Sequence, residues 1–211
     1  MSEGVHHPLF ARLYERLAPK LEKEGAAEHR RELLAGLEGR VIEVGAGTGI
    51  NFAHYPSTVN EVVAVEPEPY LRGRAAEAAR TAPVAVTVVD GLADSLPGED
   101  SSFDAGVTSL VLCSVPDQAA ALAEVHRVLR PGGELRFYEH VLANSNGLAR
   151  FQRAVGHLWP LLAGGCHPDR QTGDAIEAAG FAIEDARRFR FRPSFIETPV
   201  APHILGRARR R

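Results

Sequence analysis

Cysteine, methionine, tryptophan and lysine are all scarce in this 211-residue sequence. It contains two cysteines, one methionine and one tryptophan, and its lysines are Lys20 and Lys23. Two cysteines cannot build a disulfide framework, and by themselves they cannot build a metal site. They agree with a reducing compartment, and we expect a cytoplasmic protein. No apolar run approaches the roughly 18 residues of a membrane-spanning helix, and the first residues lack the pattern of a secretion signal.

Neither sign of charge dominates the sequence. Lys and Arg total 24 and Asp and Glu total 27, which gives a formal net charge of −3. Such a balance does not favour nonspecific binding to nucleic acid, so we expect no nucleic-acid partner. The length is that of one domain with a core of its own, and we expect residues 1–211 to form it.

Strand-like and helix-like segments alternate between residues 40 and 140. The β-branched runs that predict strands are 40–45, 61–66, 84–90, 103–108 and 134–140. Helical stretches at 69–82 and 117–129 separate some of them. This alternation predicts a parallel, doubly wound α/β sheet, whose ligands bind beyond the carboxyl ends of the strands.

The two ends of the chain complete this pattern. Helical periodicity predicts helices at 10–21 and 26–37 before the sheet, and at 148–162 and 171–179 after it. Residues 181–189 and 203–209 are expected to form two closing strands, paired antiparallel. We expect the N-terminal helices and residues 145–170 to wall a substrate pocket.

A glycine-rich turn follows the first expected strand. The run from Glu43 to Gly49 reads Glu-Val-Gly-Ala-Gly-Thr-Gly, and its glycines let the backbone approach a ligand closely. A dinucleotide fingerprint would need a glycine at Ile50, and no phosphate-binding Lys-Ser or Lys-Thr follows, so an NAD-binding oxidoreductase and a P-loop are both disfavoured. Glu43 would repel a pyrophosphate but is compatible with the positive charges of S-adenosylmethionine.

Two further acidic residues end the next strands. Glu66 lies 21 positions after Gly45, where a carboxylate can accept both hydrogen bonds of a ribose diol. Asp90 closes the third strand and is followed by Gly91 and Leu92. Asp90 is expected to accept from an adenine amino group and Leu92 to pack on the ring, although a loop aspartate can also simply cap a turn.

These motifs resemble those of the class I S-adenosylmethionine-dependent methyltransferases. The run Val-Leu-Arg-Pro-Gly-Gly at 128–133 also stands where that superfamily has a landmark. Further segments resemble the methyltransferase-like family of alkyl thiol methyltransferases, and these are 110–115, 139–141, Trp159, 165–166 and 202–206. Members of that family methylate small thiols, including hydrogen sulfide. Its animal members carry an apolar membrane-associating segment, whereas this chain has only an amphipathic stretch at 9–21, so no stable membrane insertion is expected.

The resemblance implies a fold, a cofactor and a set of binding residues. It implies a seven-strand Rossmann-like sheet, with a helical cap at 1–38, a cofactor-binding core at 39–141 and substrate-side helices and closing strands at 142–211. The implied cofactor is S-adenosyl-L-methionine and the product is S-adenosyl-L-homocysteine. The residues expected at the cofactor are Tyr14, Glu43, Gly45, Gly47, Gly49, Glu66, Pro67, Asp90, Gly91, Leu92 and Ser109.

Two residues are candidates for catalysis. Methyl transfer mainly requires alignment and exclusion of water, and a thiol acceptor needs only modest help to ionise. His140 follows the fifth strand and could take a proton or hold a thiolate, or it is a structural histidine bonded to backbone at the strand end. The adjacent Glu139 should point to the opposite face. Cys113 follows the fourth strand beside the expected transfer point, or is a small buried apolar residue.

Other aromatic and ligating residues could belong to the pocket. Trp159, Phe151 and Tyr14 are candidate walls, while His203 is expected to be structural. A metal between Cys113, Cys166 and His167 would lack the ligand spacing of a zinc site, so no metal is expected.

We therefore predict methyl transfer from S-adenosylmethionine to a small, apolar acceptor, with a thiol as the leading choice. Methylation of oxygen or nitrogen in a natural product or a lipid headgroup is the alternative within enzymes. A cofactor-binding regulatory protein without turnover is the alternative outside them.

Overall fold

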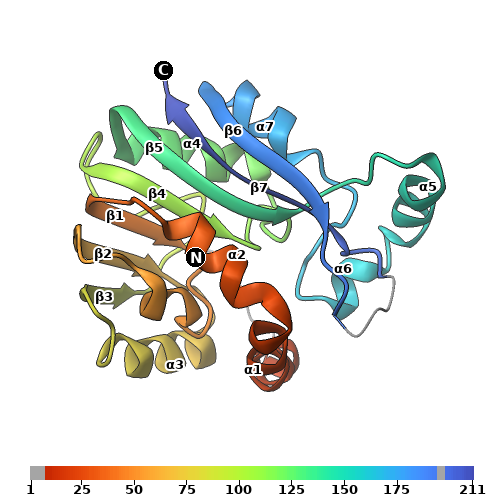
Figure 1. Ribbon diagram of the computed structural model, residues 1–211, viewed down its shortest axis with the longest axis horizontal. Coiled ribbons are helices and arrows are strands. Elements are labelled where there is room, and N and C mark those ends of the chain that lie inside the picture. The colour runs from red at the N-terminus through yellow and green to blue at the C-terminus, as the bar shows by residue number, and fades with distance from the viewer. Residues whose placement is uncertain (1–7, 194–197) are drawn as a thin grey trace.

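The computed structural model describes residues 8–193 and 198–211 (Figure 1). Its helices are α1 Pro8–Leu21, α2 Ala27–Leu34, α3 Pro69–Ala79, α4 Gln118–Val128, α5 Asn146–Val155, α6 Trp159–Leu162 and α7 Thr172–Ala178, with a short π-helix η1 Glu22–Ala26 and a short 3-10 helix η2 Ile50–His54. Its strands are β1 Gly39–Val44, β2 Val59–Val65, β3 Ala85–Val89, β4 Phe103–Ser109, β5 Leu129–His140, β6 Phe181–Arg190 and β7 Pro202–Arg210. Among the described residues, no helix is both long enough and apolar enough to cross a membrane.

The strands form one seven-stranded sheet in the order β3-β2-β1-β4-β5-β7-β6. Strands β1 to β5 are parallel, and β7 runs antiparallel between β5 and β6. The chain leaves β1 for β2 on one side and later returns to β4 on the other, so the strand order reverses at β1. A ligand crevice is expected at such a reversal, outside the carboxyl ends of the strands. The predicted doubly wound α/β fold, with its antiparallel closing pair, is confirmed.

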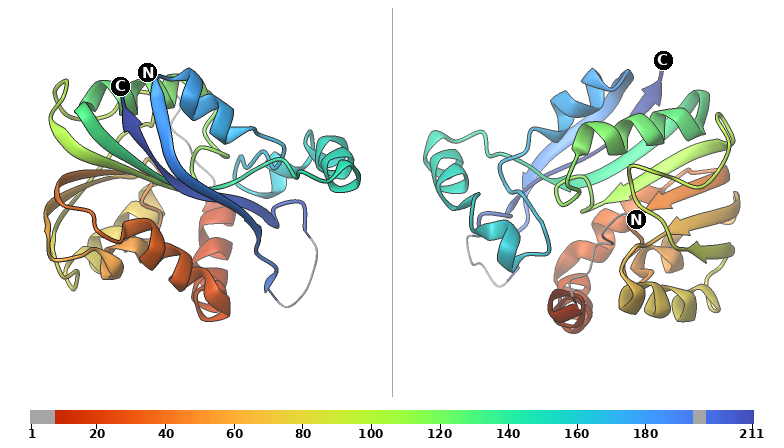
Figure 2. Two further views of the ribbon diagram at one scale, coloured as in Figure 1. Left: turned by 45° about the horizontal axis from the view of Figure 1, so that its top comes forward. Right: turned by 180° about the vertical axis from the view of Figure 1, so that it is seen from behind.

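Helices cover both faces of the sheet (Figure 2). Helices α4 and α7 lie on one face, and α2 and α3 lie on the other. Leu122 and Ile176 pack with the apolar cluster of the first face, and Leu34 and Ala75 pack with that of the second. Because β1 is covered on both sides, Ile42 is completely buried, as in other parallel strands with helices on both faces.

Side-chain caps fix where two of these helices begin. The Asp117 carboxylate accepts a hydrogen bond from the backbone N–H of Ala120 at the start of α4. The Glu68 carboxylate accepts one from Leu71 at the start of α3, where Pro69 occupies the first turn. Caps of this kind satisfy N–H groups that have no partner within the helix. The loops that precede both helices follow β2 and β4, so they lie at the edge of the sheet that carries the carboxyl ends.

The predicted single helix over 148–162 is wrong. Helix α5 ends at Val155 and the short α6 begins at Trp159. Pro160 lies in the first turn of α6, and a proline there cannot donate the hydrogen bond that would continue α5, while its ring would collide with the preceding turn. The break lets the chain turn at the end of the molecule where α5 and α6 lie (Figure 1).

Strand β5 starts earlier than the sequence predicted. The run Pro-Gly-Gly at 131–133 lies inside β5, which begins at Leu129 because that residue pairs with Phe103 of β4. The register then shifts before Ala105 pairs with Glu134. The extra residues are accommodated as an irregularity of the ladder, where Gly132 adopts a φ of +72°.

Candidate active site

A cavity of about 620 Å³ opens where the parallel strands end. Helix α1 and the chain around α6 lie beyond these carboxyl ends in Figure 1, and residues of both segments line the cavity. Predicted site residues that line it are Tyr14, Gly45, Gly47, Glu66, Pro67, Gly91, Leu92, Ser109 and His140. Those outside its lining are Glu43, Gly49, Asp90 and Cys113. Of the segments expected to wall the pocket, α1 contributes Leu13 and residues 145–170 contribute Trp159 and Gly164, whereas no residue of α2 lines the cavity.

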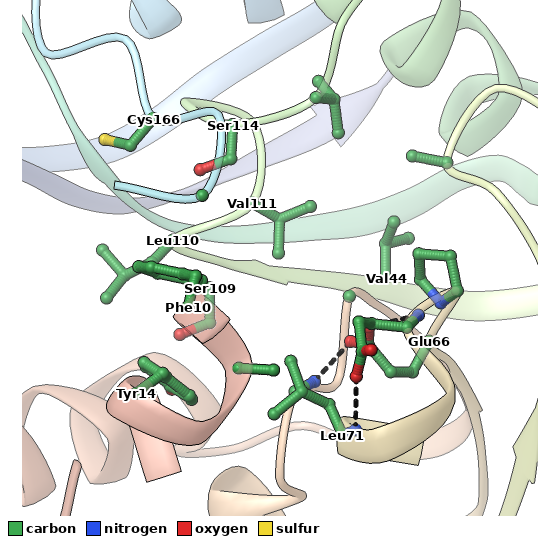
Figure 3. Close-up of a pocket in the computed structure, with 18 of the residues that line it drawn as sticks. Phe10, Tyr14, Val44, Glu66, Leu71, Ser109, Leu110, Val111, Ser114 and Cys166 are labelled. Carbon is green, nitrogen blue, oxygen red and sulfur yellow. Dashed lines mark hydrogen bonds between the residues drawn. The ribbon is translucent and has the colours of Figure 1, made fainter. Parts of the chain in front are cut away.

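Glu66 organises the glycine-rich turn at one end of the cavity. Its Oε2 accepts a hydrogen bond from the backbone N–H of Gly47 at 2.7 Å, and its Oε1 accepts one from Glu68 at 2.9 Å (Figure 3). Burial raises the pKa of Glu66, and these two hydrogen bonds oppose the rise. Each carboxylate oxygen has a second lone pair, so Glu66 can hold the turn and still accept from a ligand in the cavity.

Glu43 lies beneath this turn and is buried. Its carboxylate accepts hydrogen bonds from Asn51 Nδ2 and from the Tyr55 hydroxyl, both at 2.7 Å. Burial raises the pKa of Glu43 to about 7, although both hydrogen bonds lower it. Arg30 extends the network, because its Nη1 donates to Asn51 Oδ1 and to the hydroxyl of Ser109, which lines the cavity. In this structure Glu43 supports the turn from below, and its direct contact with a cofactor stays a prediction.

Asp90 follows β3 at the outer rim of the site. Its side chain is 71% exposed and pairs with Arg72 Nη1 at 3.0 Å. The neighbouring Gly91 and Leu92 do line the cavity. The predicted contact between Asp90 and adenine is therefore not preformed here, whereas Leu92 lies where a ring could pack.

Helix α1 covers the cavity from the side. Tyr14 lies 3.6 Å from the position that a Cβ on Gly47 would occupy. Phe10, stacked on Tyr14 with a centroid distance of 6.2 Å, lies over Gly164 in the loop after α6. One helix thus contacts both the glycine-rich turn and the opposite wall. Trp159 and Tyr14 line the cavity as predicted, but Phe151 does not.

Cys113, His140 and Cys166 meet at the other end of the cavity. The Nδ1 atom of His140 lies 3.4 Å from Cys113 Sγ and 3.4 Å from Cys166 Sγ. His140 and Cys166 line the cavity, and Cys113 is fully buried behind them. Hydrogen bonding between the two thiols raises the pKa of Cys113 and lowers that of Cys166 to about 5. Figure 3 shows Cys166 and Ser114 at this end, Glu66 at the other, and Val111 between them.

Surrounding groups hold the backbone of the Cys113 loop in place. The buried Glu139 carboxylate accepts hydrogen bonds from the N–H groups of Val111 and Cys113, each at 3.2 Å. Burial raises the pKa of Glu139, and the backbone hydrogen bonds lower it. Arg170 donates to the carbonyl oxygens of Leu112 and Val115 from the other side. As expected from the strand, only His140 of the adjacent pair reaches the cavity, because Glu139 points to the opposite face.

The grouping of His140 with the two cysteines was missed by the sequence reasoning. That reasoning paired the cysteines with His167, which neighbours Cys166 in the chain, whereas the described structure brings His140 to them. The sequence did carry a signal for it, because Cys113 follows β4 and His140 ends β5. The carboxyl ends of these adjacent parallel strands lie at the same edge of the sheet. His203 packs behind, with its Nδ1 2.8 Å from the carbonyl oxygen of Ala201, and it lines a different, smaller cavity.

This chain is similar in sequence and in fold to known proteins. Residues 42–137 match the methyltransferase domain family. The chain is 35% identical to thiol S-methyltransferase TMT1B of Rattus norvegicus, over 95% of this chain and 84% of that protein. It is also 35% identical to thiol S-methyltransferase TMT1A of Homo sapiens, over 88% of this chain and 80% of that protein. This chain belongs to the thiol S-methyltransferase family.

A solved structure supports the fold of this methyltransferase. The crystal structure of a SAM-dependent methyltransferase, possible histamine N-methyltransferase, from Thermotoga maritima superposes with a TM-score of 0.69. It shares 23% identity and covers 95% of each chain, so it supports the fold alone. Membership of the family makes S-adenosylmethionine the cofactor of this enzyme, as predicted. The glycine-rich turn and Glu66 lie within the matched residues 42–137, whereas Cys166 lies beyond them.

Proposed function

We propose that this methyltransferase transfers the methyl group of S-adenosylmethionine to the sulfur of a small, apolar thiol. The observation that carries the proposal is the single cavity that runs from Glu66 to the group of Cys113, His140 and Cys166. Relatives that are 35% identical over most of the chain are thiol S-methyltransferases, which supports sulfur as the acceptor atom.

The end of the cavity at Glu66 suits the nucleoside part of the cofactor. Glu66 follows β2, where it would accept hydrogen bonds from the ribose hydroxyls. Pro67, Gly91 and Leu92 line the cavity beside it and would hold the adenine. Since Gly45 and Gly47 also line the cavity, the amino-acid part of the cofactor would lie along the turn and point its methyl group toward Ser109 and Val111.

The opposite end suits a small thiol. Val115, Trp159 and Val200 line it with apolar surface, which would exclude water from the transfer. We assign His140 as the residue that acts on the acceptor sulfur, because it lines the cavity at this end. Cys113 does not reach the cavity and is assigned as a positioning residue that acts through His140. The two free thiols are consistent with the reducing cytoplasm, where we place the reaction.

The test uses S-adenosylmethionine labelled at its methyl group and a matched set of acceptors of one chain length. An alkyl thiol, the corresponding alcohol and the corresponding amine are incubated with the enzyme, and mass spectrometry follows the labelled product and S-adenosylhomocysteine. We expect label on the thiol, with S-adenosylhomocysteine formed in equal amount. Label on the alcohol or the amine but not on the thiol would reject sulfur as the acceptor.

A further inference from the structure

Three side chains with metal-binding atoms converge at the acceptor end of the cavity. The ligand atoms of Cys113, His140 and Cys166 all lie within 4.8 Å of one another. They come from three separate parts of the fold, which are the loop after β4, the end of β5 and the loop after α6. Two cysteines and one histidine form a soft, nitrogen-containing ligand set of the kind that binds zinc in enzymes.

The two sulfur-to-nitrogen distances within this group match those around a tetrahedral zinc ion. With Zn–S of about 2.3 Å and Zn–N of about 2.05 Å, tetrahedral angles place sulfur about 3.5 Å from nitrogen. Both sulfur atoms lie 3.4 Å from the same nitrogen, His140 Nδ1. A pair of cysteines poised only to form a disulfide would not require a histidine nitrogen equidistant from both sulfurs. The arrangement therefore favours a shared ion over a dithiol pair.

We propose that Cys113, His140 and Cys166 hold a zinc ion whose fourth coordination position faces the cavity and binds the sulfur of the acceptor thiol. The expectation of no metal rested on the spacing of Cys113, Cys166 and His167 along the chain. In the folded protein, His140 rather than His167 groups with the two cysteines. Three protein ligands and one open position are the arrangement of catalytic zinc, and structural zinc sites are closed by four protein ligands. His140 and Cys166 line the cavity, so the open position is directed toward the acceptor.

The surroundings hold these ligands in place before any ion binds. Glu139 and Arg170 fix the Cys113 loop through its N–H and carbonyl groups, as described above. The N–H of His167 donates to the carbonyl oxygen of Cys113 at 2.7 Å, which joins the two cysteine loops. A Cβ on Gly165 would lie 2.8 Å from the backbone oxygen of Ser114, so the close approach of the loops requires glycine there. Preformed ligands and fixed second-layer contacts raise metal affinity.

The ion would supply the ionisation that a thiol acceptor needs, and this step rests on the proposed function. A thiol that coordinates zinc loses its proton, which passes to water. Its sulfur then forms a bond to the methyl carbon while the bond from that carbon to the sulfonium breaks, and the electron pair stays on S-adenosylhomocysteine. Two cysteine thiolates and the acceptor thiolate give the site a net charge of −1, which attracts the sulfonium. The thioether product is neutral and leaves.

The experiment begins with the full-length protein after removal of metals by a chelator. Zinc chloride is titrated by calorimetry and bound metal is counted by mass spectrometry, while cobalt chloride is used as the spectroscopic probe. We expect one ion per chain and a sulfur-to-cobalt charge-transfer absorption. Addition of an alkyl thiol should change the cobalt spectrum, because the thiol enters the fourth position.

Variants assign the ligands. Cys166→Ser and His140→Gln should lower zinc affinity by more than the roughly 10–100-fold that the loss of an outer partner costs. His167→Gln is the matched control, since it removes the neighbouring histidine and should leave affinity unchanged. Circular dichroism checks that each variant is folded. The wild-type cobalt spectrum tests the site even if a variant does not fold.

The outcomes separate this proposal from the proposed function. Thiol methylation at full rate by protein without bound zinc would overturn the zinc proposal and leave the thiol acceptor standing. Binding of one zinc at the three ligands, without methylation of any thiol, would retain the site and reject the acceptor. Recovery of activity when zinc is restored to the metal-free enzyme supports both. If the cysteines oxidise to a disulfide and the protein binds no zinc after they are reduced again, the zinc site is rejected.

Discussion

The two ends of the cavity are built in different ways. At the cofactor end, the glycine-rich turn follows β1 and Glu66 follows β2, so both lie within residues 45–66 of the chain. At the acceptor end, Cys113, His140 and Cys166 come from three segments, and His140 and Cys166 lie outside the matched residues 42–137. The cofactor end can therefore keep its geometry while the acceptor end changes its ligands, which is how one fold serves different acceptors.

The two ends also differ in their buried ionisable groups. Carboxylates, Glu43 and Glu66, support the cofactor end, and burial raises the pKa of each. At the acceptor end, thiols and an imidazole form the reactive group, and the buried carboxylate there, Glu139, holds the backbone behind them. Substitutions that affect one end and spare the other would support this division. Substitutions that affect both ends equally would contradict it.

The largest expected effect is the pH dependence that Glu43 gives to stability. A pKa of about 7 in the folded protein, against an ordinary 4.5, corresponds to roughly 3 kcal/mol. Because the folded state holds this proton more tightly than the unfolded chain does, the contribution of Glu43 to stability is fully present below pH 4.5 and is lost as the pH rises through 7. Chemical denaturation of wild type and Glu43→Gln across this range should show their difference in unfolding free energy changing by up to that amount. Parallel curves would contradict the prediction.

The next effect is on cofactor affinity. Glu66→Ala removes the acceptor for the proposed ribose contact and for the N–H of Gly47. We expect binding of S-adenosylhomocysteine to weaken by about 1–3 kcal/mol, or roughly 5- to 150-fold, in calorimetry. Asp90→Asn is the matched control, because its carboxylate is exposed and paired with Arg72, and it should cost less than about 1 kcal/mol. An equal loss in Asp90→Asn would bring Asp90 into the cofactor site.

The same division explains how far the sequence could be interpreted. The alternation of strands and helices along the chain, the antiparallel pairing of β6 with β7, and the place of Glu66 follow from periodicity and from turns that are local in the chain. The break between α5 and α6 was missed because the apolar periodicity continues across Pro160. The role of Glu43 beneath the turn depends on Asn51 and Tyr55, which lie in and directly after η2 and whose side chains donate to its carboxylate.

The acceptor end was less accessible to sequence reasoning for a geometric reason. Cys113 and His140 are 27 positions apart, and Cys166 is a further 26 away. No fixed spacing links them, since the register of β4 with β5 and the close approach of two loops decide their distances. Adjacent parallel strands do predict that Cys113 and His140 lie near one another. No comparable rule predicts the position of the loop after α6, which carries Cys166.

The smallest expected effect tests whether the close approach of the Cys113 and Cys166 loops affects thiol methylation without affecting cofactor binding. Gly165 has a φ of +85°, and a Cβ there would meet the backbone oxygen of Ser114 at 2.8 Å. Gly165→Ala should therefore push the two cysteine loops apart and cost about 1–2 kcal/mol of stability. Thiol methylation should slow while affinity for S-adenosylhomocysteine stays within about twofold. Gly147→Ala is the control, because a Cβ at that position meets nothing within 4 Å. If Gly165→Ala weakens cofactor binding as much as it slows methylation, the two ends are coupled and the division fails.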